Sequence, residues 1–297
     1  MLTHNGVVHN CGHCMPCRIN HTSQWTLRLL YELSCWQYAS FVTLTYSEDN
    51  LPLDSGLHKS HYQNFMKNLR GRIEHKLKFY HCGEYGSKKK RPHYHAIIYG
   101  LDPFNEEHRK AVYDSWHMCE AFFFDKLPPD YKTSKSPIGK GMLPVCREDI
   151  AYVCGYVQKK LSGVMAQEEY GDKQRPYSTC SHYLGLDFAL KNQERLKSNK
   201  FTFLNAKRIG IPRYLREKLN ITFDSEKDFE VKNSQRIWKT YEIIRDEYYR
   251  KYPEMKGNIS KYAAKHFERW YENKEFDLCV QLERDYLQLN HIRYGLE

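Results

Sequence analysis

The sequence lacks any apolar run that approaches the roughly 18–20 residues of a membrane span. Its N-terminus has no secretory pattern, and it contains neither an internal repeat nor a low-complexity tract. Acidic residues are in deficit, with 36 Asp and Glu against 46 Lys and Arg. These absences argue against a membrane protein, an exported protein and a repeat architecture.

Ten cysteines in a chain without an export signal indicate reduced thiols in a cytosol rather than a disulfide framework. The 297 residues suit one large domain or two modest ones, and they carry a net charge of +10. This basic excess suggests a polyanionic partner, and 24 Tyr and 14 Phe could stack on unpaired bases. A merely basic soluble protein would show the same charge, so the motifs must decide.

The chain divides into three regions of different texture. Residues 1–19 are irregular and rich in cysteine, residues 20–165 alternate strand and helix patterns, and residues 166–297 become mainly helical, with no role that a motif assigns. Segment 171–182 looks like a loop. The expected helices are 20–37, 58–76, 105–119 and one that carries Tyr152; the expected strands are 41–46, a hairpin within 78–100, 122–124 and 142–146. This order predicts an α+β fold with a ferredoxin-like core and a mostly antiparallel sheet.

His93 and His95 lie two residues apart in the predicted hairpin, so both side chains point to one face of a strand. Glu84 lies on the neighbouring strand, and it shares that face only in one register, because a slip by one residue would reverse it. Two imidazoles and a carboxylate suit Mg²⁺ or Mn²⁺. Two ordinary strand histidines would fit the pattern equally, but Glu84 favours a three-ligand metal site.

A basic turn separates the two strands of the hairpin. It contains Lys88, Lys89, Lys90 and Arg91. Cationic side chains beside a metal ion could hold a DNA backbone there. The alternative is a solvated turn without a ligand.

Tyr152 and Tyr156 are four residues apart on a predicted helix and therefore share one side of it, with Lys159 and Lys160 beside them. Apolar residues gather on another side, which predicts that this helix packs on the sheet; they are Ile150, Val153, Val157 and Leu161. A phenol with a pKa of about 10 is a poor nucleophile at neutral pH, and a nearby lysine would favour the phenolate. Tyrosines packed at a helix rim are the alternative interpretation.

The N-terminal cysteines Cys11, Cys14 and Cys17 have a spacing typical of zinc ligands, although a structural zinc usually has four. A fourth ligand could be His9, His13, His21 or Cys35. The alternative is that these are reduced cysteines at the start of the first helix. A structural Zn²⁺ therefore remains one of two interpretations.

Three segments, taken in order, resemble the motifs of the HUH rolling-circle replication endonucleases: FVTLTY at 41–46, GEYG with RPHYHAIIYG within 83–100, and YVCGYVQKK at 152–160. The chain most closely resembles the replication initiators of microviruses, small single-stranded DNA phages, and especially their gokushovirus branch. The CGHCMPCR segment near the N-terminus and GIPRYLREKL at 210–219 also look like that branch, so the resemblance covers most of residues 11–219.

The resemblance implies a metal-dependent enzyme that nicks supercoiled replicative DNA at the plus-strand origin and rejoins the displaced single strand. It implies metal ligands at His93, His95 and Glu84, alternating nucleophiles at Tyr152 and Tyr156, and an assisting lysine at 159 or 160. A covalent 5′-phosphotyrosine and a free 3′-OH would result. We accordingly expect action in the cytoplasm of a bacterial host, with a host helicase and polymerase as partners.

Two other functions share part of this pattern. An HUH transposase or a plasmid relaxase would use the same metal motif, although the pair Tyr152 and Tyr156 counts against versions with a single tyrosine. A nucleic-acid-binding protein without catalysis could use the sheet and an N-terminal zinc knuckle.

Overall fold

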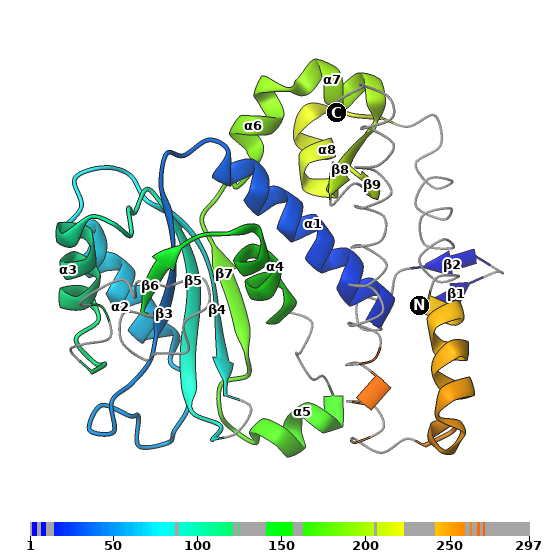
Figure 1. The fold of residues 1–297 in the computed structure, drawn as a ribbon, viewed down its shortest axis with the longest axis horizontal. Helices are drawn as coiled ribbons and strands as arrows, with labels where there is room; N and C mark the ends of the chain where they lie inside the picture. The colour runs from blue at the N-terminus through cyan, green and yellow to red at the C-terminus, as the bar shows by residue number, and fades with distance from the viewer. Residues whose placement is uncertain are drawn as a thin grey trace, which may run out of the picture. The chain divides into compact units, whose positions relative to one another are not determined.

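The computed structural model describes residues 2–4, 7–9, 15–86, 89–120, 124, 141–156, 163–204, 207–222, 241–258, 262, 266, 267 and 270 (Figure 1). The chain forms two compact units. One is Thr22–Lys191, and the other combines Met1–His21 with Asn192–Glu297. The predicted metal ligands and tyrosines all lie in the unit Thr22–Lys191, which we call the sheet unit.

The sheet unit is built on five antiparallel strands in the order β6-β3-β5-β4-β7. The strands are β3 (Ala39–Leu44), β4 (Lys78–Tyr85), β5 (Pro92–Tyr99), β6 (Met142–Pro144) and β7 (Tyr177–Cys180). With α2 (Lys59–Arg70) between β3 and β4, and α3 (Glu106–Ser115) between β5 and β6, the chain order is strand, helix, strand, strand, helix, strand. That order and the arrangement of the first four strands are ferredoxin-like. The predicted α+β fold with an antiparallel sheet is confirmed.

Helices cover both faces of the sheet (Figure 1). Tyr94, Ala96 and Ile98 of β5 pack in the core that α2 and α3 complete. Ile97 and Tyr99 point to the opposite face. There they meet α4 (Arg147–Tyr156) and the part of α1 (Met15–Leu33) that belongs to this unit. Because side chains alternate along a strand, every second residue of β5 faces α4, and His93 and His95 belong to that set.

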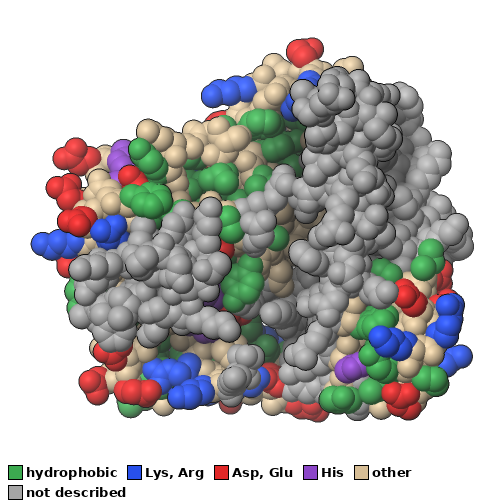
Figure 2. Space-filling model, in the orientation of Figure 1, with side chains coloured by type: hydrophobic (Ala, Val, Ile, Leu, Met, Phe, Trp, Pro, Cys, Tyr) green, Lys and Arg blue, Asp and Glu red, His purple; other side chains and the backbone are tan. Residues whose placement is uncertain are grey.

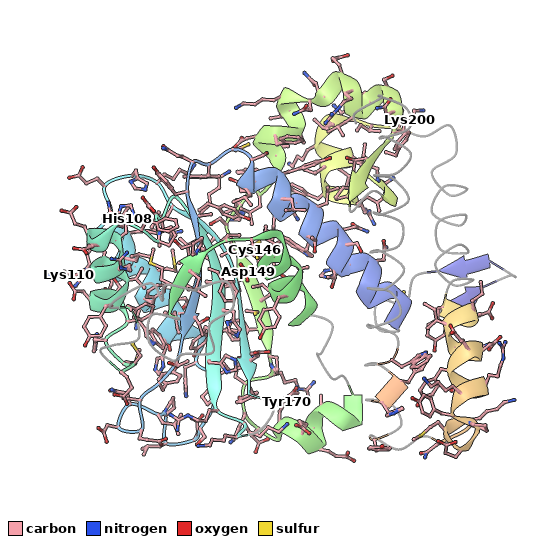
Figure 3. All side chains as sticks on the ribbon, in the orientation of Figure 1. His108, Lys110, Cys146, Asp149, Tyr170 and Lys200 are labelled. Atoms are coloured by element: carbon pink, nitrogen blue, oxygen red, sulfur yellow. The ribbon has the colours of Figure 1, made fainter. Side chains whose placement is uncertain are left out.

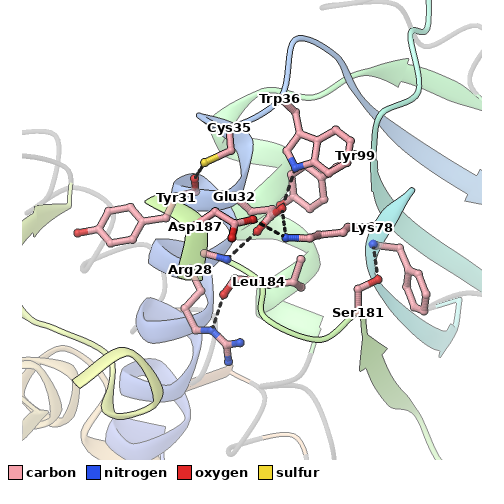
Figure 4. A network of polar contacts seen from close by, with 12 residues as sticks. Arg28, Tyr31, Glu32, Cys35, Trp36, Lys78, Tyr99, Ser181, Leu184 and Asp187 are labelled. Carbon is pink, nitrogen blue, oxygen red and sulfur yellow. Dashed lines mark hydrogen bonds and ion pairs between the residues drawn. The ribbon is translucent and has the colours of Figure 1, made fainter. Parts of the chain in front are cut away.

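A buried polar network ties α1 to the sheet and to α6 (Leu186–Lys191) (Figure 4). The Glu32 carboxylate is fully buried and lies 2.8 Å from Lys78 Nζ, which also contacts Asp187 at 3.0 Å. Glu32 additionally accepts hydrogen bonds from Trp36 Nε1 and from the backbone N–H of Gly185. Burial lowers the pKa of Lys78, but the two carboxylates outweigh it and the net pKa is raised.

Strand β7 lies in segment 171–182, which the sequence alone predicted to be a loop. It pairs along β4, from Gly83↔Tyr177 to Tyr80↔Cys180. Four residues at a sheet edge are too short to show a clear alternation, and backbone pairing rather than side-chain pattern creates this strand. The sheet unit therefore extends to Lys191, beyond the boundary expected near residue 165. Phe124 lies in a turn, and the other two residues of the strand expected at 122–124 lie outside the described residues.

The second unit contains more strand than its helical texture suggested. Its elements are β1 (Leu2–His4) paired with β2 (Val7–His9), α7 (Gln193–Asn199), β8 (Phe201–Leu204) paired with β9 (Lys207–Gly210), α8 (Arg213–Leu219), a helix at 241–251 and η2 (Pro253–Met255). Tyr248 is buried in an aromatic cluster, and its hydroxyl contacts His266 Nδ1 at 2.9 Å. Among the described residues, no helix is both long and apolar enough to cross a bilayer.

Charge is mixed on the part of the sheet unit where α3 lies. Figure 2 shows acidic and basic side chains side by side at that edge, and the exposed residues of α3 include Glu106, Glu107 and Lys110. Figure 3 labels Lys110 and His108 there. The net charge of +10 therefore does not mark this edge as a nucleic-acid surface.

Candidate metal and tyrosine site

The three predicted metal ligands meet at one end of the β4–β5 hairpin. The strand register places Glu84 directly opposite His93, and Cys82 opposite His95. Residues that face each other across two paired strands share a face of the sheet. Glu84, His93 and His95 therefore all point toward the α4 side, which the sequence left dependent on register.

The ligand atoms converge closely enough for one ion. Glu84 Oε1 lies 2.7 Å from His93 Nε2 and 3.4 Å from His95 Nε2. One ligand atom from each residue lies within 4.8 Å of the other two. No other group of three His, Cys, Asp or Glu in the described part of the chain meets this condition.

The ring of His93 is oriented by a backbone carbonyl. Its Nδ1 lies 3.1 Å from the carbonyl oxygen of Arg91, which can only accept, so Nδ1 carries a hydrogen. In a neutral ring Nε2 then presents a lone pair to the Glu84 carboxylate. Two electron-rich atoms at 2.7 Å repel unless a proton or a cation lies between them. The donor set therefore fits a bound cation.

Strand β3 supplies two further contacts to the site. Thr43 pairs with His95 in the β3–β5 register, and its Oγ1 lies 3.1 Å from His95 Nδ1. Phe41, two residues earlier on the same face, stacks on the His95 ring with centroids 5.4 Å apart. The FVTLTY segment entered the sequence comparison as a motif without a role for these two residues. Their proximity to His95 depends on long-range strand pairing, which no local pattern shows.

Burial and hydrogen bonding act oppositely on the ionisable ligands. Burial raises the pKa of Glu84, but hydrogen bonds from His93 and His95 outweigh it and leave the pKa below its usual value. The pKa of His95 is lowered, mainly by burial and against the influence of Glu84. An ionised carboxylate beside a neutral buried imidazole is the protonation state in which both can ligate a cation.

Helix α4 places Tyr152 beside the three ligands. The helix begins after Cys146, whose backbone N–H donates to Asp149 Oδ2 at 2.8 Å in the manner of half a capping box (Figure 3). Ile150, Val153 and Cys154 are fully buried against the sheet. The side chain between them on the helix, Tyr152, is 49% exposed.

The Tyr152 ring packs edge-on against His95, with ring centroids 5.6 Å apart and an interplanar angle of 71°. It also contacts Phe41, with centroids 6.3 Å apart. One ligand histidine, the phenylalanine on β3 and the first tyrosine of the predicted pair thus form a single contact group. A Cβ added at Gly155, one turn further along, would meet nothing within 4 Å, so the backbone is open there.

Several predicted site residues are placed only in part. Tyr156 is the last residue of α4, but its side chain is not among those described. Lys159, Lys160, Lys88, Cys11 and Cys14 lie outside the described residues, and Cys17 is buried in the first turn of α1. The tyrosine–lysine arrangement and the zinc interpretation therefore stay predictions.

The basic turn contacts the rest of the sheet unit on two sides. Lys90 forms an ion pair with Glu169 of α5 (Gly163–Tyr170), next to Tyr170, which stacks on Tyr85. Arg91 forms an ion pair with Glu48. Lys89 is exposed. The cations of this turn therefore differ in environment, which the sequence, as a simple basic run, did not show.

Comparison with known proteins places this geometry in a family context. Residues 39–161 match the family model for the ORF2 type of replication-associated protein. The chain is 30% identical over 243 residues to replication-associated protein ORF4 of Chlamydia phage 1. It is a relative of phage replication-associated proteins.

Two more relatives extend this relationship. Replication-associated protein VP4 of Bdellovibrio phage phiMH2K is 27% identical over 217 residues, and replication-associated protein ORF2 of Spiroplasma virus 4 is 25% identical over 231 residues. The three alignments cover 76%, 70% and 73% of this chain and 57%, 66% and 69% of the relatives. The chain thus spans little more than half of the Chlamydia phage protein. No solved structure matches it. The resemblance to microvirus replication proteins is confirmed.

Proposed function

We propose that this chain is a replication initiator that nicks the replicative-form DNA of a phage at its plus-strand origin, links itself to the 5′ end and later rejoins the displaced strand. The observation that carries the proposal is the contact of Tyr152 with His95, because it puts a phenol beside the three converging ligands Glu84, His93 and His95. The kinship with phage replication-associated proteins supports the same activity.

The chemistry assigned to Tyr152 is an in-line displacement at phosphorus. Its phenol oxygen attacks the scissile phosphodiester, a bond between phosphorus and that oxygen forms, and the bond from phosphorus to the 3′ oxygen breaks. The phenol proton leaves as the nucleophile attacks, and the departing 3′ oxygen takes up a proton to become a hydroxyl. One phosphoester replaces another, so cutting and rejoining need no nucleotide cofactor.

Glu84, His93 and His95 would hold the divalent ion, Mg²⁺ or Mn²⁺. When bound, such an ion supplies positive charge to a non-bridging oxygen of the scissile phosphate. The residues around the ligands keep the imidazoles aimed at one point: Thr43 contacts the far nitrogen of His95, and the Arg91 carbonyl holds the far nitrogen of His93. Outer contacts of this kind fix the tautomer and the direction of each ring.

Tyr156 is the proposed second nucleophile. On a helix it lies one turn from Tyr152, and residues four apart have Cβ atoms about 6 Å from each other. Release of a closed circle while the replicating end stays attached requires two acceptors, and this helix supplies two phenols. We propose that Lys159 or Lys160 assists ionisation of the phenols, that Lys88, Lys89 and Lys90 contact the DNA backbone, and that the enzyme works in the host cytoplasm with a host helicase and polymerase.

Covalent capture of DNA tests this proposal without knowledge of the origin. The full chain is incubated with Mn²⁺ and a labelled pool of random-sequence single-stranded oligonucleotides, and adducts that survive boiling in detergent are isolated and sequenced. We expect a proteinase-sensitive adduct with one recurring junction sequence. His95→Ala should abolish the adduct while the protein stays folded. The absence of any adduct from the wild-type chain, or an undiminished adduct in His95→Ala, would contradict the proposal.

A further inference from the structure

The turn that joins β4 to β5 is fastened to the protein through Arg91, although its sequence looks like a patch of cations open to solvent. The Arg91 Nη2 donates to the carbonyl oxygens of Tyr46 at 2.9 Å and Ser47 at 3.4 Å, while Nη1 pairs with Glu48. Its side chain is 28% exposed, against 56% for that of Lys90. A guanidinium with three acceptors is already occupied by protein.

The segment that Arg91 grips is itself anchored. The backbone N–H of Ser47 donates to the Met118 carbonyl at 2.8 Å, and Trp116 Nε1 donates to the carbonyl of Thr45 at 2.7 Å. The Tyr46 hydroxyl lies 2.9 Å from that of Tyr94, inside the core. The guanidinium therefore connects the hairpin turn to a fixed point at the end of β3.

The other end of Arg91 reaches the metal site. Its carbonyl oxygen accepts from the backbone N–H of Gly86 at 2.9 Å and from His93 Nδ1 at 3.1 Å. Lys90, the residue before it, has φ +53°, a left-handed backbone that costs a non-glycine residue free energy and must be held by its surroundings. The direction of the Arg91 carbonyl, and with it the orientation of the His93 ring, thus depends on how the turn is held.

We propose that Arg91 is a positioning residue for the ligand His93 rather than a contact to DNA. Its side chain fixes the turn on residues 46–48, and its carbonyl holds the His93 ring with Nε2 aimed at the shared ligand point. The inference rests on the proposed metal site and adds a residue to it. The exposed Lys89, two residues earlier, keeps the role of backbone contact.

A pair of charge-matched variants separates the two roles. Arg91→Gln and Lys89→Gln each remove one positive charge from the same turn. Free Mn²⁺ is followed by electron paramagnetic resonance during titration of the full chain, and binding of a labelled single-stranded oligonucleotide is measured at several salt concentrations without divalent ions. We expect Arg91→Gln to weaken Mn²⁺ binding about 10–100-fold and to leave the salt slope unchanged. Lys89→Gln should leave Mn²⁺ binding intact and lower the salt slope by about 0.7.

Arg91→Lys distinguishes geometry from charge, because it keeps the cation and loses the planar fork. It should weaken Mn²⁺ binding as Arg91→Gln does. Wild-type Mn²⁺ affinity in either Arg91 variant, or a salt slope lowered in Arg91→Gln as in Lys89→Gln, would overturn the inference. If neither variant folds, Glu48→Gln takes their place, since the Glu48 side chain is 80% exposed; weaker Mn²⁺ binding supports the inference and unchanged binding overturns it. A wild-type chain that binds no Mn²⁺ would instead contradict the metal site itself.

Discussion

Replacement of Thr43 by valine should weaken metal binding while leaving the fold intact. Valine has nearly the shape of threonine and an equal preference for strands, so β3 should form normally. What is lost is the hydroxyl 3.1 Å from His95 Nδ1. His95 is 7% exposed, so water cannot freely replace this partner.

The size of the effect follows from which state needs the hydroxyl. With a cation on Nε2, the His95 ring must carry its proton on Nδ1 and needs an acceptor there. Without the cation, the ring can place its proton on Nε2 instead, facing Glu84 at 3.4 Å. An unsatisfied buried donor costs about 1–3 kcal/mol, and most of that cost falls on the metal-bound state. At about 1.4 kcal/mol per tenfold change, Mn²⁺ affinity should fall roughly 5- to 150-fold.

Thr43→Ser is the matched control, because it keeps the hydroxyl and removes the methyl group. Titration with Mn²⁺ gives the affinity of each variant, and urea unfolding without metal reports the stability of the ion-free protein. We expect Thr43→Ser to bind Mn²⁺ nearly as well as wild type and Thr43→Val to bind it much more weakly. Equal affinities in Thr43→Val and wild type would refute the reasoning. A loss in Thr43→Ser as large as that in Thr43→Val would show that packing of the methyl group, not the hydrogen bond, orients His95.

Three further changes have definite expected results. Glu84→Gln should weaken Mn²⁺ binding so that a higher Mn²⁺ concentration partly restores adduct formation, and a loss indifferent to metal would point to misfolding. Tyr152→Phe and Tyr156→Phe should each still form some adduct on a short origin oligonucleotide but fail to release circles, while the double variant forms none; an adduct in the double variant would place the nucleophile elsewhere. Lys78→Met leaves a buried carboxylate without its cation and should cost about 3–5 kcal/mol of the free energy of unfolding, measured by urea denaturation; a loss under about 1 kcal/mol would mean that the remaining donors suffice.

The local patterns of the sequence were enough to find the chemistry. A spacing of two in a strand places His93 and His95 on one face whatever the rest of the fold does, because side chains alternate along any strand. A spacing of four on a helix that is apolar on another side likewise exposes Tyr152, which the structure finds half exposed beside fully buried Val153. The family resemblance, carried by three short motifs in order, also needed no structure and is confirmed by the relatives.

Tertiary structure decided everything that depends on pairing between distant segments. Glu84 joins the histidines because the hairpin adopts a register that puts it opposite His93, and a slip of one residue would have turned it away. Thr43 reaches His95 because β3 pairs with β5, across a sequence separation that includes α2 and β4. The short edge strand β7 and the engaged guanidinium of Arg91 were invisible for the same reason: backbone hydrogen bonds and cross-strand contacts follow from the packed sheet, whereas residue spacing reports only which side chains share a face of one element.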